Sequence, residues 1–89
     1  MVLVMKKSQI IEQLIISQFQ QDFSELEHKA VVETEDEHHF VVTVISDAFI
    51  NKKLLERQRM VYASLGDKFA TGEIHALSLK TFTHEELKK

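Results

Sequence analysis

The chain has 89 residues, the length of one small domain, and 44% of them are hydrophobic and 28% charged, which is typical of a globular protein. Its sequence contains no cysteine, which excludes disulfide bonds, redox-active cysteine pairs and thiolate metal ligands from this chain. Its two glycines, Gly66 and Gly72, are too few for a glycine-rich phosphate-binding loop. We expect residues 1–89 to form a single domain in which residues 1–7 are flexible.

Charge is distributed unevenly along the chain, although the net charge is only −3. Residues 1–47 hold nine acidic and three basic side chains, whereas residues 48–89 hold five acidic and eight basic ones. A modest basic surface in the second half fits an acidic partner or nucleic acid, but the whole chain lacks the strongly basic balance of a dedicated nucleic-acid binder. No apolar run approaches the ~20 residues of a membrane span, and we expect a cytoplasmic protein that contacts no membrane.

In chain order, the first predicted element is an amphipathic helix over Ser8–Phe19, where apolar residues recur at helical spacing. Residues 20–29 are mostly polar and form a connector, in which His28 is expected to be an ordinary surface histidine. The segments Ala30–Glu35 and His39–Ser46 are rich in β-branched residues and predict two strands. Because only a short acidic turn separates them, these strands are expected to form an antiparallel hairpin.

The next predicted element is a second helix. Asn51 is its expected N-cap, because asparagine side chains accept hydrogen bonds from the first free backbone N–H groups of a helix. The helical pattern can extend past Gly66 through Phe69, and Gly72 is the expected terminating residue. The apolar positions that define the pattern are Leu54, Leu55, Val61 and Leu65.

The C-terminal part predicts a third strand and a short helix. The third strand is expected over Ile74–Phe82, with Leu77 and Leu79 on one face and Ala76, Ser78 and Lys80 on the other. Thr83 and Glu86 have the three-residue spacing of a capping box, which predicts a helix start.

The element order α-β-β-α-β-α predicts an α+β fold with a three-stranded mixed sheet and its helices on one face. A strand–helix–strand connection is right-handed in nearly all proteins and makes the third strand parallel to the second. Parallel neighbours begin at the same sheet edge, about 4.8 Å apart. If these strands are adjacent, His38 or His39 and His75 gather at that edge.

Candidate functional groups are few. We expect no enzymatic activity, because the chain has no cysteine nucleophile and no nucleophile elbow, and its acidic turn has the character of a solvated charged loop. One polar face of the second helix carries basic side chains, which are either a solvated surface or contacts for a nucleic-acid backbone. The chain has no GxxG loop of the kind that KH domains use to clamp that backbone. The basic residues are Lys52, Lys53, Arg57 and Arg59.

Several segments from about residue 30 onward match one known family in order and spacing. They are Glu37-His38-His39-Phe40, Ser46-Asp47-Ala48-Phe49, the helical stretch LLERQRMVY over 54–62, Ile74-His75-Ala76-Leu77-Ser78 and Thr81-Phe82-Thr83-His84-Glu85-Glu86. The combination of the Arg-x-Arg-x-Val-Tyr helix with Ile-His-Ala resembles the BolA family. The chain departs from the family pattern at Asn51, Gln58, His84 and Leu87, where the family usually has Gly, His, Pro and Trp.

The resemblance to BolA proteins implies a fold similar to class II KH domains. It also implies a monothiol glutaredoxin as partner, with a [2Fe–2S] cluster bridged between the two proteins and glutathione as a further ligand. On the BolA side the resemblance implies His75 and a second ligand from the hairpin loop, which is His39 or, as the fallback, His38. The free protein is then expected to be a monomer or a weak homodimer.

Each of these interpretations has an alternative. His75 is otherwise a partly buried strand histidine, and the His38–His39 pair is otherwise a solvated part of the acidic turn. The alternative function is a DNA-binding transcriptional regulator that contacts phosphates through Lys52, Lys53, Arg57 and Arg59.

Overall fold

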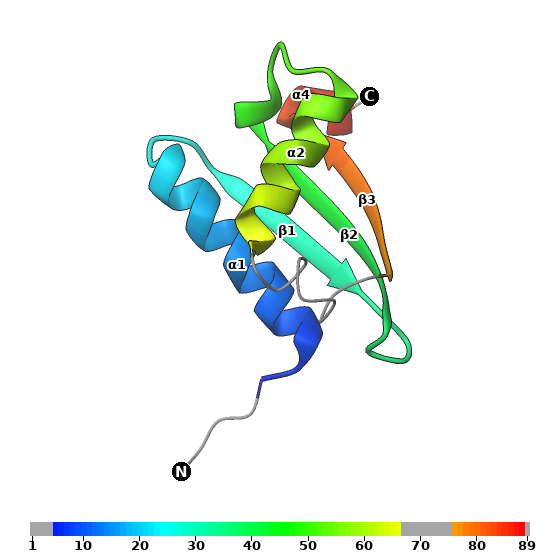
Figure 1. Ribbon diagram of the computed structural model, residues 1–89. Helices are drawn as coiled ribbons and strands as arrows, with labels where there is room; N and C mark the ends of the chain where they lie inside the picture. Colours follow the sequence, from blue (N-terminus) through cyan, green and yellow to red (C-terminus); the bar gives the residue numbers. More distant parts are fainter. Residues whose placement is uncertain (1–4, 67–75, 89) are drawn as a thin grey trace.

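A three-stranded mixed sheet in the order β1-β2-β3 is the centre of the fold in the computed structural model, which describes residues 5–66 and 76–88 (Figure 1). The strands are β1 (His28–Glu33), β2 (His39–Ser46) and β3 (Ala76–Phe82). β1 pairs with β2 antiparallel, and β2 pairs with β3 parallel. The predicted hairpin, the predicted parallel pairing and the α+β class are therefore confirmed, while the likeness to class II KH domains stays a prediction.

Some sequence-based predictions lie outside the described residues. They concern the flexibility of residues 1–4, the helical extension over 67–69, the terminating role of Gly72, the start of the third strand at Ile74 and the position of His75.

Two helices, α1 (Lys7–Asp22) and α2 (Leu54–Leu65), lie side by side against the same face of the sheet (Figure 1). A 3₁₀ turn, η1 (Asp47–Phe49), follows β2, and the short helix α4 (His84–Leu87) follows β3. Within the described ranges no helix is both long and apolar enough to cross a bilayer.

The core lies between the sheet and these two helices, and it follows from the sequence patterns. Alternation along β2 buries Phe40, Val42 and Val44 on the helix-facing side, because successive strand residues point to opposite faces. From α1, Ile11, Ile15 and Phe19 contribute at four-residue spacing, which places them on one helix face. Phe49, which is fully buried, Val61 and Leu65 complete the same cluster.

The main differences from the sequence prediction concern element boundaries. Asn51 does not cap α2, because its backbone has a left-handed φ of 64° and the helix begins only at Leu54 with Lys53 at its N-cap. The helix ends at Leu65, and Gly66 follows with a φ of 52°, a conformation that glycine adopts without a steric penalty. β1 begins at His28, two residues earlier than predicted, because His28 pairs in register with Ser46 at the end of β2.

His28 is not the ordinary surface residue that the sequence indicated. Its Nε2 lies 3.0 Å from the carbonyl oxygen of Phe23, and its Nδ1 lies 2.7 Å from the hydroxyl of Ser46. Its ring also makes an edge-on contact with Phe19, at 5.5 Å between centroids. In the neutral ring that suits these partners, Nε2–H donates to the carbonyl and Nδ1 accepts from the serine. His28 therefore joins the connector after α1 to the end of β2.

Ser46 is fully buried, and its loss should destabilise the fold. Its hydroxyl accepts a hydrogen bond from the backbone N–H of Ala48 at 3.0 Å as well as bonding His28. Ser46→Ala leaves both groups without this partner, which we expect to lower the free energy of unfolding by about 1–3 kcal/mol in urea titrations. The exposed Ser24→Ala is the control and should stay within about 0.5 kcal/mol of the wild type. Equal unfolding midpoints for Ser46→Ala and wild type would contradict this role.

Candidate functional site

The turn between β1 and β2 is ordered by hydrogen bonds between its own side chains and backbone. The hydroxyl of Thr34 donates to the carbonyl oxygen of His39 at 2.7 Å and accepts from the N–H of Glu37 at 3.0 Å. Asp36 Oδ1 accepts from the N–H groups of both His38 and His39 at 2.9 Å. Side-chain bonds of this kind fix a turn, because they satisfy backbone groups that the strand ladder does not reach.

The same turn is attached to the start of α1. The carboxylate of Glu37 accepts a hydrogen bond from the backbone N–H of Ser8 at 3.2 Å and lies 3.3 Å from its hydroxyl. A carboxylate is favourable at a helix N-terminus, where free N–H groups and the helix dipole present positive charge. Glu37 itself has a left-handed φ of 58°, so the turn bends sharply at this residue. The hairpin end is thus held against the first helix.

His39 opens β2 and projects from the sheet face opposite to the buried Phe40. Its side chain is 79% exposed, and its Nδ1 lies 3.0 Å from Asp36 Oδ2. The pKa of Asp36 is well below its usual value, because the backbone N–H of His39, then its ring and then the N–H of His38 donate to the carboxylate. His38 is also exposed. A surface hollow of about 490 Å³ lies beside His39 and is lined by Glu33, Thr34, Glu35, Asp36, His39 and Val41.

The parallel register brings His39 next to the start of β3. The Cα partner of His39 is Ala76, the residue that directly follows His75 in the sequence. His75, predicted as the first ligand, lies outside the described residues. Within 5–66 and 76–88, no three His, Asp or Glu side chains are arranged to hold a metal ion by themselves. The assignment of His75, His39 and His38 as ligands stays a prediction.

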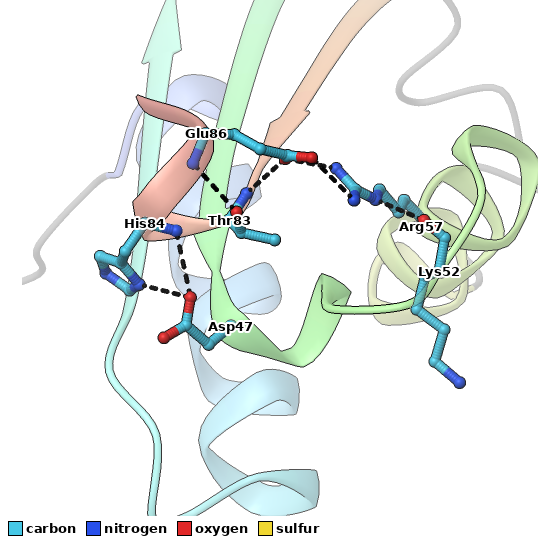
Figure 2. A network of polar contacts seen from close by, with 6 residues as sticks. All are labelled: Asp47, Lys52, Arg57, Thr83, His84 and Glu86. Atoms are coloured by element: carbon cyan, nitrogen blue, oxygen red, sulfur yellow. Dashed lines mark hydrogen bonds and ion pairs between the residues drawn. The ribbon is translucent and has the colours of Figure 1, made fainter. Parts of the chain in front are cut away.

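The four basic residues predicted on the second helix do not form one uniform surface. Lys52, Lys53 and Arg59 are exposed, whereas the side chain of Arg57 is only 13% exposed. Figure 2 shows the guanidinium of Arg57 between two partners: its Nη1 and Nη2 donate to the carboxylate of Glu86 at 2.7 and 3.1 Å, and its Nε donates to the carbonyl of Lys52 at 2.9 Å. A phosphate would have to compete with Glu86 for Arg57.

Exposed apolar side chains are interspersed with these lysines. Ile50, Leu54 and Leu55 are each more than half exposed. Apolar side chains gain nothing from a phosphate backbone, so this part of the surface is less suited to nucleic acid than its charge alone indicates. The assignment of Lys52, Lys53, Arg57 and Arg59 to nucleic-acid binding is not tested by these contacts and stays a prediction.

Two long-range contacts hold α4 in place beside the segment that follows β2 (Figure 2). The first is the Arg57–Glu86 pair. In the second, the backbone N–H and the ring Nδ1 of His84 lie 3.1 and 3.2 Å from Asp47 Oδ1. The N–H of His84 and then its ring donate to this carboxylate and hold the pKa of Asp47 below its usual value.

The capping box predicted from the sequence is present at the start of α4 and adds to this network. Glu86 Oε1 accepts from the N–H of Thr83 at 2.8 Å, and the hydroxyl of Thr83 accepts from the N–H of Glu86 at 3.1 Å. The spacing of Thr83 and Glu86 indicated this box, but no local signal indicated that Arg57, 29 residues away, would share the carboxylate.

The Arg57–Glu86 pair should make stability depend on pH. Arg57 first, and then the N–H of Thr83, lower the pKa of Glu86 from 4.5 to about 2. A carboxylate with a lowered pKa stabilises the folded state above its unfolded pKa, and this contribution disappears as the pH falls toward the folded pKa. We expect Glu86→Gln to unfold at lower urea than wild type at pH 6, and the difference to shrink steadily between about pH 4.5 and pH 2.

The matched control is Glu85→Gln, which removes the same charge from the neighbouring exposed position of α4. Its difference from wild type should be smaller than that of Glu86→Gln at pH 6. A Glu86→Gln effect that is constant from pH 6 to pH 3 would contradict an ionised carboxylate as its source.

Comparison with known proteins gives one consistent result. A family model described as BolA-like protein matches residues 10–86. The Escherichia coli protein named DNA-binding transcriptional regulator BolA is 35% identical over 79 residues, which are 85% of this chain and 74% of that protein. An uncharacterized Haemophilus influenzae protein is 45% identical over 51 residues, which are 57% of this chain and 60% of that protein. The structure of a bolA protein homologue from Coxiella burnetii is 32% identical with a TM-score of 0.73, over 96% of this chain and all of that one.

Proposed function

The chain belongs to the BolA-like family, and from this premise we propose that it is a non-catalytic partner of a monothiol glutaredoxin. The two proteins would share a bridged [2Fe–2S] cluster in iron–sulfur cluster assembly and trafficking or in iron regulation. The glutaredoxin cysteine and glutathione would supply ligands on one side. His75 and His39 would supply them on the other side, with His38 as the alternative to His39.

One observation carries this proposal: the exposed imidazole of His39 lies at the sheet edge where β3 begins. Its side chain is 79% exposed at the first position of β2, and its strand partner is Ala76. Neighbouring strands are only about 4.8 Å apart, so residues at the starts of β2 and β3 are close neighbours. The sequence places the other predicted ligand, His75, directly before Ala76.

The donor groups on this chain suit an iron–sulfur cluster that is completed from outside. Imidazole replaces thiolate on one iron of Rieske-type [2Fe–2S] centres, so a protein without cysteine can still ligate such a cluster. The exposed position of His39 lets a second protein approach, whereas both ring nitrogens of the partly buried His28 are occupied by Ser46 and Phe23. A bridged cluster needs ligands from this chain for only one of its two irons.

The first test replaces the predicted ligands one at a time. The purified variants would be mixed with a monothiol glutaredoxin, ferrous iron, sulfide and glutathione, and the cluster followed by visible circular dichroism. His39→Ala should weaken the spectrum of the mixed complex, because a ligand is lost. His75→Ala should abolish it.

The neighbouring exposed histidine serves as the matched control, because His38→Ala removes an imidazole from the same turn and should have a smaller effect than His39→Ala. Far-ultraviolet circular dichroism should show that all variants remain folded. If the His38→Ala/His39→Ala double variant gives the wild-type spectrum, the turn supplies no ligand. If folded His75→Ala gives the wild-type spectrum, the cluster-sharing proposal is wrong.

A second candidate function is DNA binding, favoured by the name of the Escherichia coli relative and by the exposed Lys52, Lys53 and Arg59. Removing one side chain that neutralises a phosphate should reduce the slope of log affinity against log salt by about 0.9. Neutralising Lys52, Lys53 or Arg59 should therefore lower this slope in titrations of duplex DNA. Arg57→Gln should instead act mainly on the stability of the fold, because the guanidinium of Arg57 is already bound to Glu86. We expect weak, salt-sensitive binding. Sequence-specific binding that persists at physiological salt would favour DNA binding over cluster sharing as the function of this protein.

A further inference from the structure

We propose that Asp36 is a positioning residue that fixes the tautomer of His39, so that Nε2 is the nitrogen presented to iron. The role in ligation rests on the proposed cluster-sharing function. The tautomer, in contrast, is a property of the free protein and is measurable without any cluster.

The carboxylate of Asp36 is held firmly before it meets the ring. Its Oδ1 accepts the N–H groups of His38 and His39, both at 2.9 Å, and lies 3.4 Å from the hydroxyl of Thr34. These bonds leave Oδ2 directed at the ring of His39, 3.0 Å from Nδ1. The acceptor that faces the imidazole is therefore fixed by the turn itself.

An ionised carboxylate only accepts hydrogen bonds, so the nitrogen that faces it must carry the proton. Nδ1–H of His39 donates to Asp36, and in the neutral ring the lone pair then lies on Nε2. No described residue makes a hydrogen bond to that nitrogen. Histidines that ligate metals commonly donate their other ring N–H to a carboxylate, which orients the ring and makes the ligating nitrogen a better donor.

Packing does not supply this orientation. The His39 side chain is 79% exposed, so without a hydrogen-bond partner it would sample several rotamers and lose that freedom on ligation. Asp36 restricts the ring in advance. His38, one residue earlier, is exposed and its ring has no partner of this kind among the described residues. This difference gives a physical reason for His39, and not His38, to be the ligand.

The sharpest probe is Asp36→Asn, because it keeps the turn and reverses the polarity of one contact. The amide oxygen of asparagine can still accept from the N–H groups of His38 and His39, while its NH₂ group faces Nδ1 and donates to it. His39 would then carry its proton on Nε2, where the lone pair is needed. Glu35→Gln is the matched control, since it removes one negative charge from an exposed position of the same turn.

The first measurement is a long-range proton–nitrogen correlation spectrum of the histidine rings of the free, ¹⁵N-labelled protein at pH 8. Wild type and Glu35→Gln should show His39 protonated mainly on Nδ1, and Asp36→Asn should show it protonated mainly on Nε2. The ring of His38 should be the same in all three. A wild-type His39 that is protonated mainly on Nε2, or a tautomer unchanged in Asp36→Asn, would overturn the proposal.

The second measurement is cluster formation with the glutaredoxin mixture. We expect Asp36→Asn to bind the cluster roughly 10–100-fold less tightly than wild type, as is typical when such an outer partner is lost, and Glu35→Gln to bind like wild type. An inverted tautomer with unchanged cluster affinity would overturn the role of Asp36 in ligation. Failure of wild type itself to form the mixed cluster would instead refute the proposed function and leave the tautomer result standing.

Discussion

Parallel pairing of β2 with β3 is the constraint on which the arrangement of this molecule depends. The register runs from His39 beside Ala76 to Ile45 beside Phe82. The two strands therefore begin at the same end of the sheet and finish at the opposite end. Residues far apart in the sequence are thereby sorted to two ends of the fold. The hairpin turn lies where the strands begin, and η1, the start of α2 and α4 lie where they end (Figure 1).

The two ends differ in chemistry. At the end where the strands finish, two side-chain pairs join α4 to the segment after β2. They are Arg57 with Glu86 and Asp47 with His84, so these polar groups contact one another within the protein. At the end where the strands begin, Asp36 uses its carboxylate to order a turn while the ring of His39 remains exposed. A surface that is ordered and still accessible is suited to contact with a partner, because little freedom is lost on binding.

The sequence predicted most of the fold because its strongest signals are local and periodic. Alternation around Phe40, Val42 and Val44 located β2 at its observed bounds, and the spacing of Thr83 and Glu86 identified the start of α4. The misjudged features depend on tertiary contacts. His28 was interpreted as a surface residue because its partner Ser46 is 18 residues away, and the left-handed backbone of Asn51 reflects a turn that propensity alone assigned to a helix cap.

The sequence predicted only part of the candidate site, because the rest depends on contacts that periodicity does not reveal. Topology brought the start of β2 beside the start of β3, but it did not show that Asp36 bonds the ring of His39, because three-residue contacts in a turn depend on the backbone path. Likewise, the four basic residues considered for nucleic-acid binding, Lys52, Lys53, Arg57 and Arg59, share a charge but not an environment. Only the packing of Arg57 over Phe49 and against Glu86 separates it from the exposed lysines.

The most direct test of the central claim is pulsed electron paramagnetic resonance of the reduced mixed complex. The chain would be labelled with ¹⁵N-histidine and combined with an unlabelled monothiol glutaredoxin, glutathione, iron and sulfide. We expect strong ¹⁵N couplings from directly ligating imidazole nitrogens, and we expect their contribution to the spectrum to be smaller in the His39→Ala variant. A bound cluster without ¹⁵N couplings of ligand strength would contradict ligation by the histidines of this chain.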